Sequence, residues 1–435
     1  MRQRREPQAL DSTAEGRGTA YLVGAAREGV PPGLVASHLD ELSALADTAG
    51  FEEAGRAIVH LRQVHAATFI GRGQAGDVGA MAHGLGASVI VVDEELTPAQ
   101  VRNLEAATGL PVVDRAGLII EIFAQRARSR EARTQVELAR LEYLLPRLAG
   151  RWTHLSRQVG GGPGGTKGEG EKQIELDRRI IRRRIDRLRR ELRRIESARR
   201  VRRSGRRGLP RAALVGYTNV GKSSLFNAIV HAGVHVEDRL FATLDPTVRC
   251  VETDPRGLFL LKDTVGFIRK LPHHLVASFR STFEESADSD LLVLVADASH
   301  PAVEAQVATV ESVLDSSGLA DRPRLLVLNK IDAASADRVH DLSDRWPGAL
   351  LASARTGAGV DQLVAALGDR LLGETRVVEL AIPENRPDLL AAAHRAGRVE
   401  RCEQVDGELR IRLRARERPI SAFEGRLAAA SGGSR

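Results

Sequence analysis

Apolar residues in the first quarter of the chain alternate between the spacing of helices and the spacing of strands. Leu39, Leu42, Leu45 and Ala46 recur at helical spacing, which predicts an amphipathic helix over 32–49. Further helices are expected from the turn at 70–73 to about residue 84 and over 98–108. Short apolar runs that predict strands lie at 19–24, 57–64, 87–92 and 111–113. The alternation predicts a small α/β domain with a mostly parallel sheet over 19–117.

Helical spacing dominates from 118 to 207. A first helix is predicted over 118–148, where Ala132, Val136, Ala139 and Tyr143 are spaced four, three and four residues apart. The second helix carries a heptad seam made of Ile174, Ile181, Ile185, Leu188, Leu192 and Ile195. Matching apolar stripes predict an antiparallel helical hairpin, and the glycine-rich run 160–168 between the helices is expected to be mobile.

Alternating strand and helix patterns return from 208 to 374 and predict a second α/β domain. Its strands are expected at 212–215, 248–253, 258–262, 291–296, 324–328 and 349–352. Residues 375–435 hold two short alternating runs, at 376–382 and 408–413, with a helix at 388–396 between them. These runs predict a small α+β domain at the end of the chain. The polar, charged residues 1–18 are expected to form a disordered tail.

The composition is that of an ordinary globular protein, with 435 residues of which 43% are hydrophobic and 28% charged. No apolar run approaches the ~20 residues that span a bilayer, and the arginine-rich start has no apolar region behind it. The two cysteines, Cys250 and Cys402, lack the CxxC spacing of a zinc site and fit a reducing compartment. We expect a cytoplasmic monomer without a membrane span or an export signal.

Positive charge is concentrated in the second predicted helix of the hairpin. Residues 178–207 contain sixteen arginines and three acids, a net charge of +13, so the rest of the chain sums to −6 within the formal total of +7. A basic arm of this kind suits a partner rich in phosphate, because each neutralised phosphate releases counterions. The alternative is a solvated coiled-coil face, although such a face would carry more acids for pairing with the arginines.

The segment 216–223 reads GYTNVGKS and matches the phosphate-binding pattern G-x-x-x-x-G-K-S between an apolar strand and a predicted helix. Backbone N–H groups curl around an anion in such a loop, and glycine leaves room for that approach. Lys222 is expected to reach the β- and γ-phosphates, and the Ser223 hydroxyl to ligate Mg²⁺. The predicted nucleotide contacts are Gly216, Tyr217, Thr218, Asn219, Val220, Gly221, Lys222 and Ser223.

Four further motifs follow in the chain order of a GTPase. Asp263 of a D-x-x-G segment is expected to orient the Mg²⁺ shell, and Gly266 to face the γ-phosphate. Thr243, in the loop between, is expected to complete the Mg²⁺ coordination. Asp332 of N-K-I-D can accept hydrogen bonds from guanine N1–H and N2–H₂, which adenine does not offer, and a backbone N–H of 353–355 is expected at guanine O6. The predicted contacts are Phe241, Ala242, Thr243, Leu244, Asp245, Asp263, Thr264, Val265, Gly266, Asn329, Lys330, Ile331, Asp332, Ser353, Ala354 and Arg355.

Phe267 follows Gly266, at the position where Ras-like enzymes carry a glutamine that orients the attacking water. We therefore expect the protein alone to hydrolyse GTP slowly and to depend on a partner or a cation for stimulation. Asn219 either ligates a K⁺ ion that replaces an arginine finger or only hydrogen-bonds within the loop. The predicted catalytic residues are Lys222, Thr243, Gly266 and Asn219, with Mg²⁺ at Ser223 and Thr243.

Over residues 19–375 the chain resembles the HflX family of ribosome-associated GTPases. The resemblance rests on DRLFATLDPT at 238–247 and DTVGFIRKLP at 263–272, and on segments outside the GTPase motifs such as DEELTPAQ at 93–100 and YLLPRL at 143–148. It implies a P-loop GTPase domain at 208–374 joined by a helical hairpin at 118–207 to the N-terminal α/β domain, with a small α+β C-terminal domain at 375–435.

The resemblance also implies the partners: GTP and GDP, and the large ribosomal subunit with its RNA. The implied role is the splitting or rescue of stalled ribosomes under stress. Two other roles remain open from the residues, a large-subunit assembly factor and a GTP-regulated binding module with a ligand on the N-terminal domain. For the last, the turn Gly71-Arg72-Gly73 is either a phosphate site or a structural turn.

Overall fold

The computed structural model describes residues 18–30, 32–150, 167–204, 209–230, 240–241, 247–253, 257–270, 289–373, 375–405 and 407–431. By their contacts the residues form two compact units. The first comprises residues 1–203, 237–245 and 268–281, and the second comprises 204–236, 246–267 and 282–435. The predicted tail lies outside the described residues, except for Gly18, which begins a strand. The glycine-rich run also lies outside them up to Thr166, and a helix begins at the next residue, Lys167.

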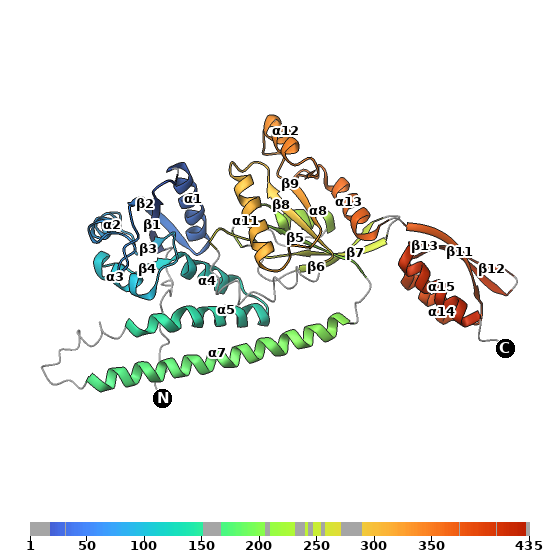
Figure 1. The fold of residues 1–435 in the computed structure, drawn as a ribbon, viewed down its shortest axis with the longest axis horizontal. Helices are drawn as coiled ribbons and strands as arrows, with labels where there is room; N and C mark the ends of the chain where they lie inside the picture. Colours follow the sequence, from blue (N-terminus) through green and yellow to red (C-terminus); the bar gives the residue numbers. More distant parts are fainter. Residues whose placement is uncertain are drawn as a thin grey trace. The chain divides into compact units, whose positions relative to one another are not determined.

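The first unit contains a four-stranded parallel sheet in the order β2-β1-β3-β4. Its strands are β1 (Gly18–Arg27), β2 (Phe51–Leu61), β3 (Val89–Val92) and β4 (Val112–Asp114). The helices α2 (Arg72–Gly84) and α3 (Pro98–Thr108) cover one face, and α1 (Pro32–Thr48) and α4 (Arg115–Arg126) cover the other (Figure 1). The predicted α/β fold is confirmed. β2 begins six residues earlier than predicted. The first six residues of this edge strand include Glu52, Glu53 and Arg56, and none of the six is fully buried, so no apolar run marks them.

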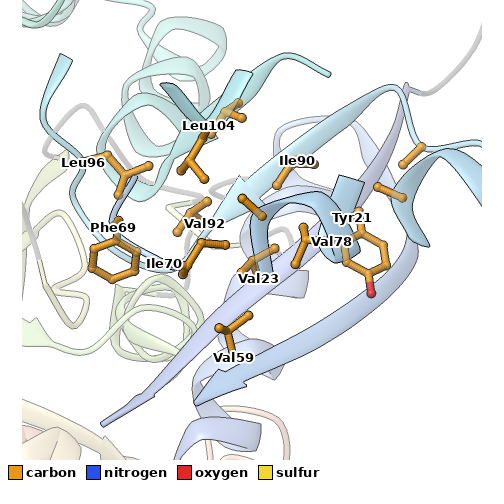
Figure 2. Packing of buried hydrophobic residues seen from close by; sticks show 14 of the residues in the cluster. Tyr21, Val23, Val59, Phe69, Ile70, Val78, Ile90, Val92, Leu96 and Leu104 are labelled. Atoms are coloured by element: carbon orange, nitrogen blue, oxygen red, sulfur yellow. The ribbon is translucent and has the colours of Figure 1, made fainter. Parts of the chain in front are cut away.

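One face of this sheet packs into a continuous apolar core. Tyr21 and Val23 of β1 and Ile90 of β3 meet Val78 of α2 and Leu104 of α3 (Figure 2). The cluster encloses a cavity of about 10 Å³ with an apolar lining. A space of this size holds at most one water and offers it no polar partner, so it is a packing void rather than a ligand site.

The predicted helix over 118–148 is in fact interrupted. After α4 ends at Arg126, Ser129 caps α5 (Arg130–Leu144) by accepting a hydrogen bond from the N–H of Ala132 at 3.0 Å, and a 3-10 helix, η1 (Leu145–Gly150), follows. A serine at this point offers its side chain to the first free N–H groups of a helix, which favours a new start over continuation.

The long helix α7 (Lys167–Ser204) lies along α5 (Figure 1). The predicted seam of α7 is confirmed at Ile181, Ile185, Leu188 and Leu192. These residues pack against Leu138 and Leu141 of α5 and Leu145, the first residue of η1. The stripe predicted on α5 does not belong to this cluster. Its member Tyr143 instead donates a hydrogen bond at 2.7 Å to Asp114, at the start of α4. α5 therefore has two buried faces.

The second unit contains a six-stranded sheet in the order β10-β9-β8-β5-β7-β6, parallel except for the β6–β7 pair. The strands, each at its predicted place, are β5 (Arg211–Gly216), β6 (Thr247–Thr253), β7 (Gly257–Asp263), β8 (Leu291–Asp297), β9 (Arg324–Asn329) and β10 (Leu350–Leu351). The accompanying helices are α8 (Lys222–Val230), α11 (Val303–Ser316), α12 (Ala336–Arg345) and α13 (Val360–Leu372).

The end of the chain forms a three-stranded antiparallel sheet, β11-β13-β12, with two helices. Its elements are β11 (Thr375–Pro383), α14 (Pro387–Ala396), β12 (Arg398–Val405), β13 (Glu408–Arg416) and α15 (Glu417–Ser431). Sequence patterning missed β12 and α15. β12 is an edge strand whose residues are mostly exposed, with Val399 packed against the core, so it has no apolar alternation to detect.

A buried group of charges, the Asp93 cluster, lies at the carboxyl end of β3 in the first unit. Asp93 is 3% exposed, and Arg115, the first residue of α4, is 1% exposed. Arg115 Nη1 donates to Asp93 Oδ1 at 2.6 Å, Nη2 pairs with Glu41 of α1, and Nε donates to the carbonyl of Arg269 at 3.1 Å. Arg269 Nη2 donates to Asp93 Oδ2 at 2.9 Å, and Lys270 Nζ donates to the Asp93 carbonyl at 3.0 Å. Three cations thus surround one buried carboxylate.

The Asp93 cluster occupies the switch point of the sheet. β1 and β3 are neighbours, but β2 lies beyond one and β4 beyond the other, so the connections leave in opposite directions. Doubly wound sheets bind ligands in the crevice at the carboxyl ends of such strands. In this unit Arg269 and Lys270 bind there instead, so the place is taken by a segment of the chain itself.

Candidate functional site

The predicted nucleotide motifs of the second unit gather at one edge of its sheet. Gly216 ends β5, Asp263 ends β7 and Asn329 ends β9, and Ser353 follows β10 by two residues. These strands are parallel, so their carboxyl ends share an edge. The topology therefore brings segments more than a hundred residues apart into a single site.

The loop 216–223 wraps around the amino group of Lys222. This side chain is 7% exposed, and its Nζ donates to the carbonyls of Tyr217 at 2.7 Å and Gly216 at 3.2 Å. Burial lowers the pKa of Lys222 to about 8, although the negative charge of Asp263 opposes the change. Gly221 has φ +87°, and a Cβ there would lie 2.4 Å from Asn329 Nδ2, so no other residue fits.

Thr218 supplies a second polar group inside the loop. Its side chain is 5% exposed, and its Oγ1 has no hydrogen-bond partner in the described part of the chain. A buried hydroxyl without a partner is costly, and a phosphate oxygen is an acceptor that would satisfy it. The loop thus offers a buried cation and a hydroxyl to an anion.

Ser223 and Asp263 fit a magnesium site. The Ser223 hydroxyl donates to Asp263 Oδ2 at 2.6 Å, and Asp263 is 1% exposed. Hydroxyl and carboxylate oxygens beside a phosphate loop are the hard ligands that Mg²⁺ prefers, and the ion would neutralise phosphate charge there. The other predicted ligand, Thr243, lies outside the described residues together with Ala242, Leu244 and Asp245.

The D-x-x-G segment is pinned to the phosphate loop through backbone groups. The N–H of Phe267 donates to the Gly216 carbonyl at 3.0 Å, and the N–H of Thr218 donates to the Phe267 carbonyl at 2.7 Å. A Cβ on Gly266 would lie 2.9 Å from Lys222 Nζ, which explains the glycine. Phe267 itself is 2% exposed and packs in the core, so its ring orients no water.

The two residues between Asp263 and Gly266 serve the sheet. The Thr264 hydroxyl donates to the Leu214 carbonyl at 2.6 Å, and Val265 is buried. Tyr217 and Val220 of the phosphate loop are buried as well. Because these side chains are buried, the nucleotide contacts predicted for these residues would come from their backbone groups.

Asn329 holds the two halves of the site together. Its Nδ2 donates to the Val220 carbonyl at 2.8 Å, and its Oδ1 accepts from the N–H of Ala354 at 3.1 Å, with the side chain 1% exposed. The N–H of Ile331 also donates to the Ala352 carbonyl at 3.3 Å. The N-K-I-D loop is thereby tied both to the phosphate loop and to the segment after β10.

Lys330 bridges the phosphate loop to a residue that motif reading missed. Its Nζ donates to the Asn219 carbonyl at 2.7 Å and pairs with Asp297 Oδ2 at 2.7 Å. Asp297 ends the apolar strand β8 at the same sheet edge. Its position directly after an apolar run is the sequence feature that could have identified it as a site residue. Asn219 has φ +62° and an exposed side chain, so its predicted role as a K⁺ ligand stays a prediction.

Asp332 presents its carboxylate between two neighbours. The Ser353 hydroxyl donates to Oδ1 at 2.5 Å, and Arg355 Nη2 pairs with Oδ2 at 2.5 Å. The hydrogen bond from Ser353, together with the nearby Arg355 charge, lowers the pKa of Asp332, so the group is an anionic acceptor at neutral pH. Such an acceptor suits the N1–H and N2–H₂ edge of guanine.

Among the described residues that are predicted to contact nucleotide, only Phe241 belongs to the first unit. Its ring packs edge-on against Phe123 of α4, with centroids 4.7 Å apart and planes at 85°. The side chain is thus committed to a hydrophobic contact, and a contact between this residue and nucleotide stays a prediction.

A phosphate loop with a buried lysine, a Ser–Asp pair and an N-K-I-D carboxylate define a P-loop GTP-binding domain. Family models match three successive parts of the chain: the GTP-binding GTPase N-terminal region over 36–124, the GTP-binding GTPase middle region over 126–206, and a 50S ribosome-binding GTPase over 211–330. Relatives named GTPase HflX match most of the chain. The chain is a GTPase of the HflX family.

The protein named GTPase HflX of Escherichia coli (strain K12) is 41% identical over 381 residues, covering 86% of this chain and 89% of that protein. The one from Magnetococcus marinus is 45% identical over 359 residues, covering 82% and 83%. Among solved structures, a GTP-binding protein from Sulfolobus solfataricus in complex with GDP is 25% identical, covers 81% of this chain and 99% of its own, and gives a TM-score of 0.41. Within the described residues no helix is both long and apolar enough to cross a bilayer.

Proposed function

We propose that this GTPase uses GTP to engage the RNA of the large ribosomal subunit, and that in doing so it splits or rescues stalled ribosomes under stress. The family model over 211–330, described as a ribosome-binding GTPase, supports a ribosomal partner. The observation that carries the proposal is that some arginines of α7 pair with carboxylates of α5, whereas others are exposed without such a partner.

One group of arginines is paired within the hairpin. Arg184 Nε donates to Glu137 of α5 at 2.6 Å, and Arg189 Nη2 donates to Glu142 at 2.7 Å. These pairs hold α7 against α5. Since their charge is neutralised by neighbouring carboxylates, they contribute little to attraction of a polyanion.

The second group points away from α5. Arg183, Arg187 and Arg194 are exposed and form no ion pair with any described residue, and Arg190 donates only to the carbonyl of Asp186 at 3.2 Å. Unpaired like charges on one helix repel each other, and phosphates of RNA would relieve that repulsion. We assign the RNA contact to these four residues.

Reversal of the four unpaired arginines tests this assignment. Replacing Arg183, Arg187, Arg190 and Arg194 with glutamate is expected to weaken binding to purified large subunits and to reduce the slope of log K against log salt by roughly 0.7–0.9 for each phosphate that the variant no longer neutralises. The control reverses four exposed arginines of the second unit, namely Arg322, Arg345, Arg395 and Arg426, at equal net charge. Equal slopes for both variants would refute the RNA contact.

Reading of guanine is the second part of the proposal. Asp332→Asn is expected to lower GTP affinity about 5- to 150-fold and to raise affinity for xanthosine triphosphate, because the amide donates where the carboxylate accepted. Titration of both nucleotides measures this exchange, with Asp337→Asn on the exposed face of α12 as control. Unchanged GTP binding would show that Asp332 does not read the base.

The two other roles are a binding module with a ligand on the N-terminal domain and a large-subunit assembly factor. Contacts in the first unit bear on the binding module, and sedimentation tests the assembly factor. A ligand on the N-terminal domain is disfavoured, since Arg269 and Lys270 fill its switch point and Gln74 caps the turn at Gly71 by accepting the Gly71 N–H at 2.9 Å. An assembly factor would co-sediment with immature large subunits and leave whole ribosomes intact. A splitting factor would convert whole ribosomes to subunits in the presence of GTP. We propose that the protein does so in the cytoplasm and as a monomer.

A further inference from the structure

Both oxygens of the Asp332 carboxylate already have a partner, and the two partners differ in kind. Ser353 is fully buried, and its short contact with Oδ1 is fixed by the segment after β10. The Arg355 side chain is 76% exposed, and only its end reaches Oδ2. Of the two, Arg355 is therefore the partner that can leave at little cost.

The guanidinium of Arg355 has the same donor chemistry as the edge of guanine that Asp332 is expected to read. In guanine, C2 carries the N1–H and N2–H₂ groups side by side, a cyclic guanidine with two parallel N–H donors. An arginine side chain presents the same fork to a carboxylate, with a positive charge in addition. One carboxylate thus faces two chemically similar donors.

We propose that Arg355 competes with the guanine base for Asp332 and so sets how fast and how tightly the protein loads guanine nucleotides. This inference rests on the GTP binding proposed above. Because an exposed ion pair is weak, the competition is modest, corresponding to about a two- to fivefold effect on affinity. It is also screened by salt, since the Arg355 side chain lies largely in solvent.

Arg355→Ala tests the competition through rate constants. With a fluorescent GDP analogue in stopped flow, the variant is expected to associate about two- to fivefold faster than the parent, with an unchanged dissociation rate and a correspondingly lower Kd. The difference is expected to shrink as ionic strength rises. Arg322→Ala, an exposed arginine of the same unit, is the control and is expected to leave both rates unchanged.

A double-mutant cycle assigns the effect to the carboxylate. In an Asp332→Asn background, with a xanthosine nucleotide as ligand, Arg355→Ala is expected to change the association rate by less than in the parent, because the charged acceptor is gone. An undiminished effect would mean that Arg355 acts on another group and would overturn the proposal. Slower association or faster dissociation in Arg355→Ala alone would show instead that Arg355 supports the bound base, and unchanged rates would show no role.

Failure of this inference is distinguishable from failure of guanine recognition. If the parent protein binds no guanine nucleotide, the proposed function is wrong at its root. If the parent binds and the Arg355→Ala rates equal those of the parent, only the competition is refuted.

Discussion

Lys222→Met is expected to stabilise the protein alone while removing its affinity for GTP. The buried ammonium of Lys222 has a pKa of about 8 against an ordinary value near 10.4, a penalty of roughly 3 kcal/mol for the charged form. Loss of its bonds to the carbonyls of Gly216 and Tyr217 offsets about 2 kcal/mol of that gain. We expect the free energy of unfolding to rise by about 1 kcal/mol.

The same substitution is expected to remove the contacts that Lys222 is predicted to make with the β- and γ-phosphates. At about 1.5–3 kcal/mol for each charge-assisted hydrogen bond, this loss is expected to weaken GTP binding about 10- to 150-fold for each bond that Lys222 makes. Urea unfolding of the protein without nucleotide and a GTP titration measure the two effects. A variant that is less stable than the parent, or that keeps its affinity, would contradict the account of Lys222.

The pH dependence of the parent gives an independent check. Because the pKa of Lys222 is lower in the folded state, that state binds fewer protons than the unfolded chain between about pH 8 and 10, and unfolding free energy from this group rises with pH across that window. GTP affinity is expected to fall as pH rises through about 8, since the neutral amine attracts phosphate weakly. Lys222→Met is expected to lack both trends.

Arg115→Met is expected to cost about 3–5 kcal/mol of stability in the first unit, because it removes the most buried of the cations beside the carboxylates of Asp93 and Glu41. Arg56→Met provides a matched control. Arg56 also binds two carboxylates, Glu53 at 2.5 Å and Asp40 at 2.6 Å, but its side chain is 39% exposed. The control is expected to lose no more than about 1 kcal/mol.

Acid unfolding distinguishes the two variants further. Burial alone would raise the pKa of Asp93, but the charges of Arg115, Arg269 and Lys270 outweigh it and hold the pKa below its ordinary value. The resulting stability is present above about pH 4 and is lost as pH falls through the lowered pKa. Without the charge of Arg115, burial raises the pKa of Asp93 relative to the parent. The part of the stability that is lost in acid is therefore expected to be smaller in Arg115→Met. Losses of equal size in Arg115→Met and Arg56→Met would refute a stabilising role for burial of the cluster.

The six-stranded sheet of the second unit could be predicted closely from the sequence because its signals are local. Except for β6, each strand is a short apolar run. Asp263 and Asn329 stand where such runs end and therefore indicate both the sheet edge and the site. Asp297 escaped motif reading although it ends the strand β8 in the same way. Its importance comes from the ion pair with Lys330, which is a tertiary contact.

The features that sequence reading missed depend on distant partners or on exposure. Arg115 lies in an ordinary helix start, and nothing near it indicates a bond to a carbonyl 154 residues later. The sequence motif predicts only a backbone role for Arg355, because the pairing of its side chain with Asp332 depends on loop geometry. The exposed strand β12 lacks an apolar face, so its sequence does not show the alternation of apolar residues that predicts a strand.

The Asp93 cluster also has a consequence for biosynthesis. Lys270 is 177 residues beyond Asp93, so the carboxylate and Arg115 leave a translating ribosome well before Arg269 and Lys270 do. At about 5–20 residues per second, that interval lasts roughly 10–35 seconds. During it the nascent N-terminal sheet holds Asp93 with one of its three cations. The first part of the chain to emerge therefore reaches its full stability only after the start of the GTPase half has been synthesised.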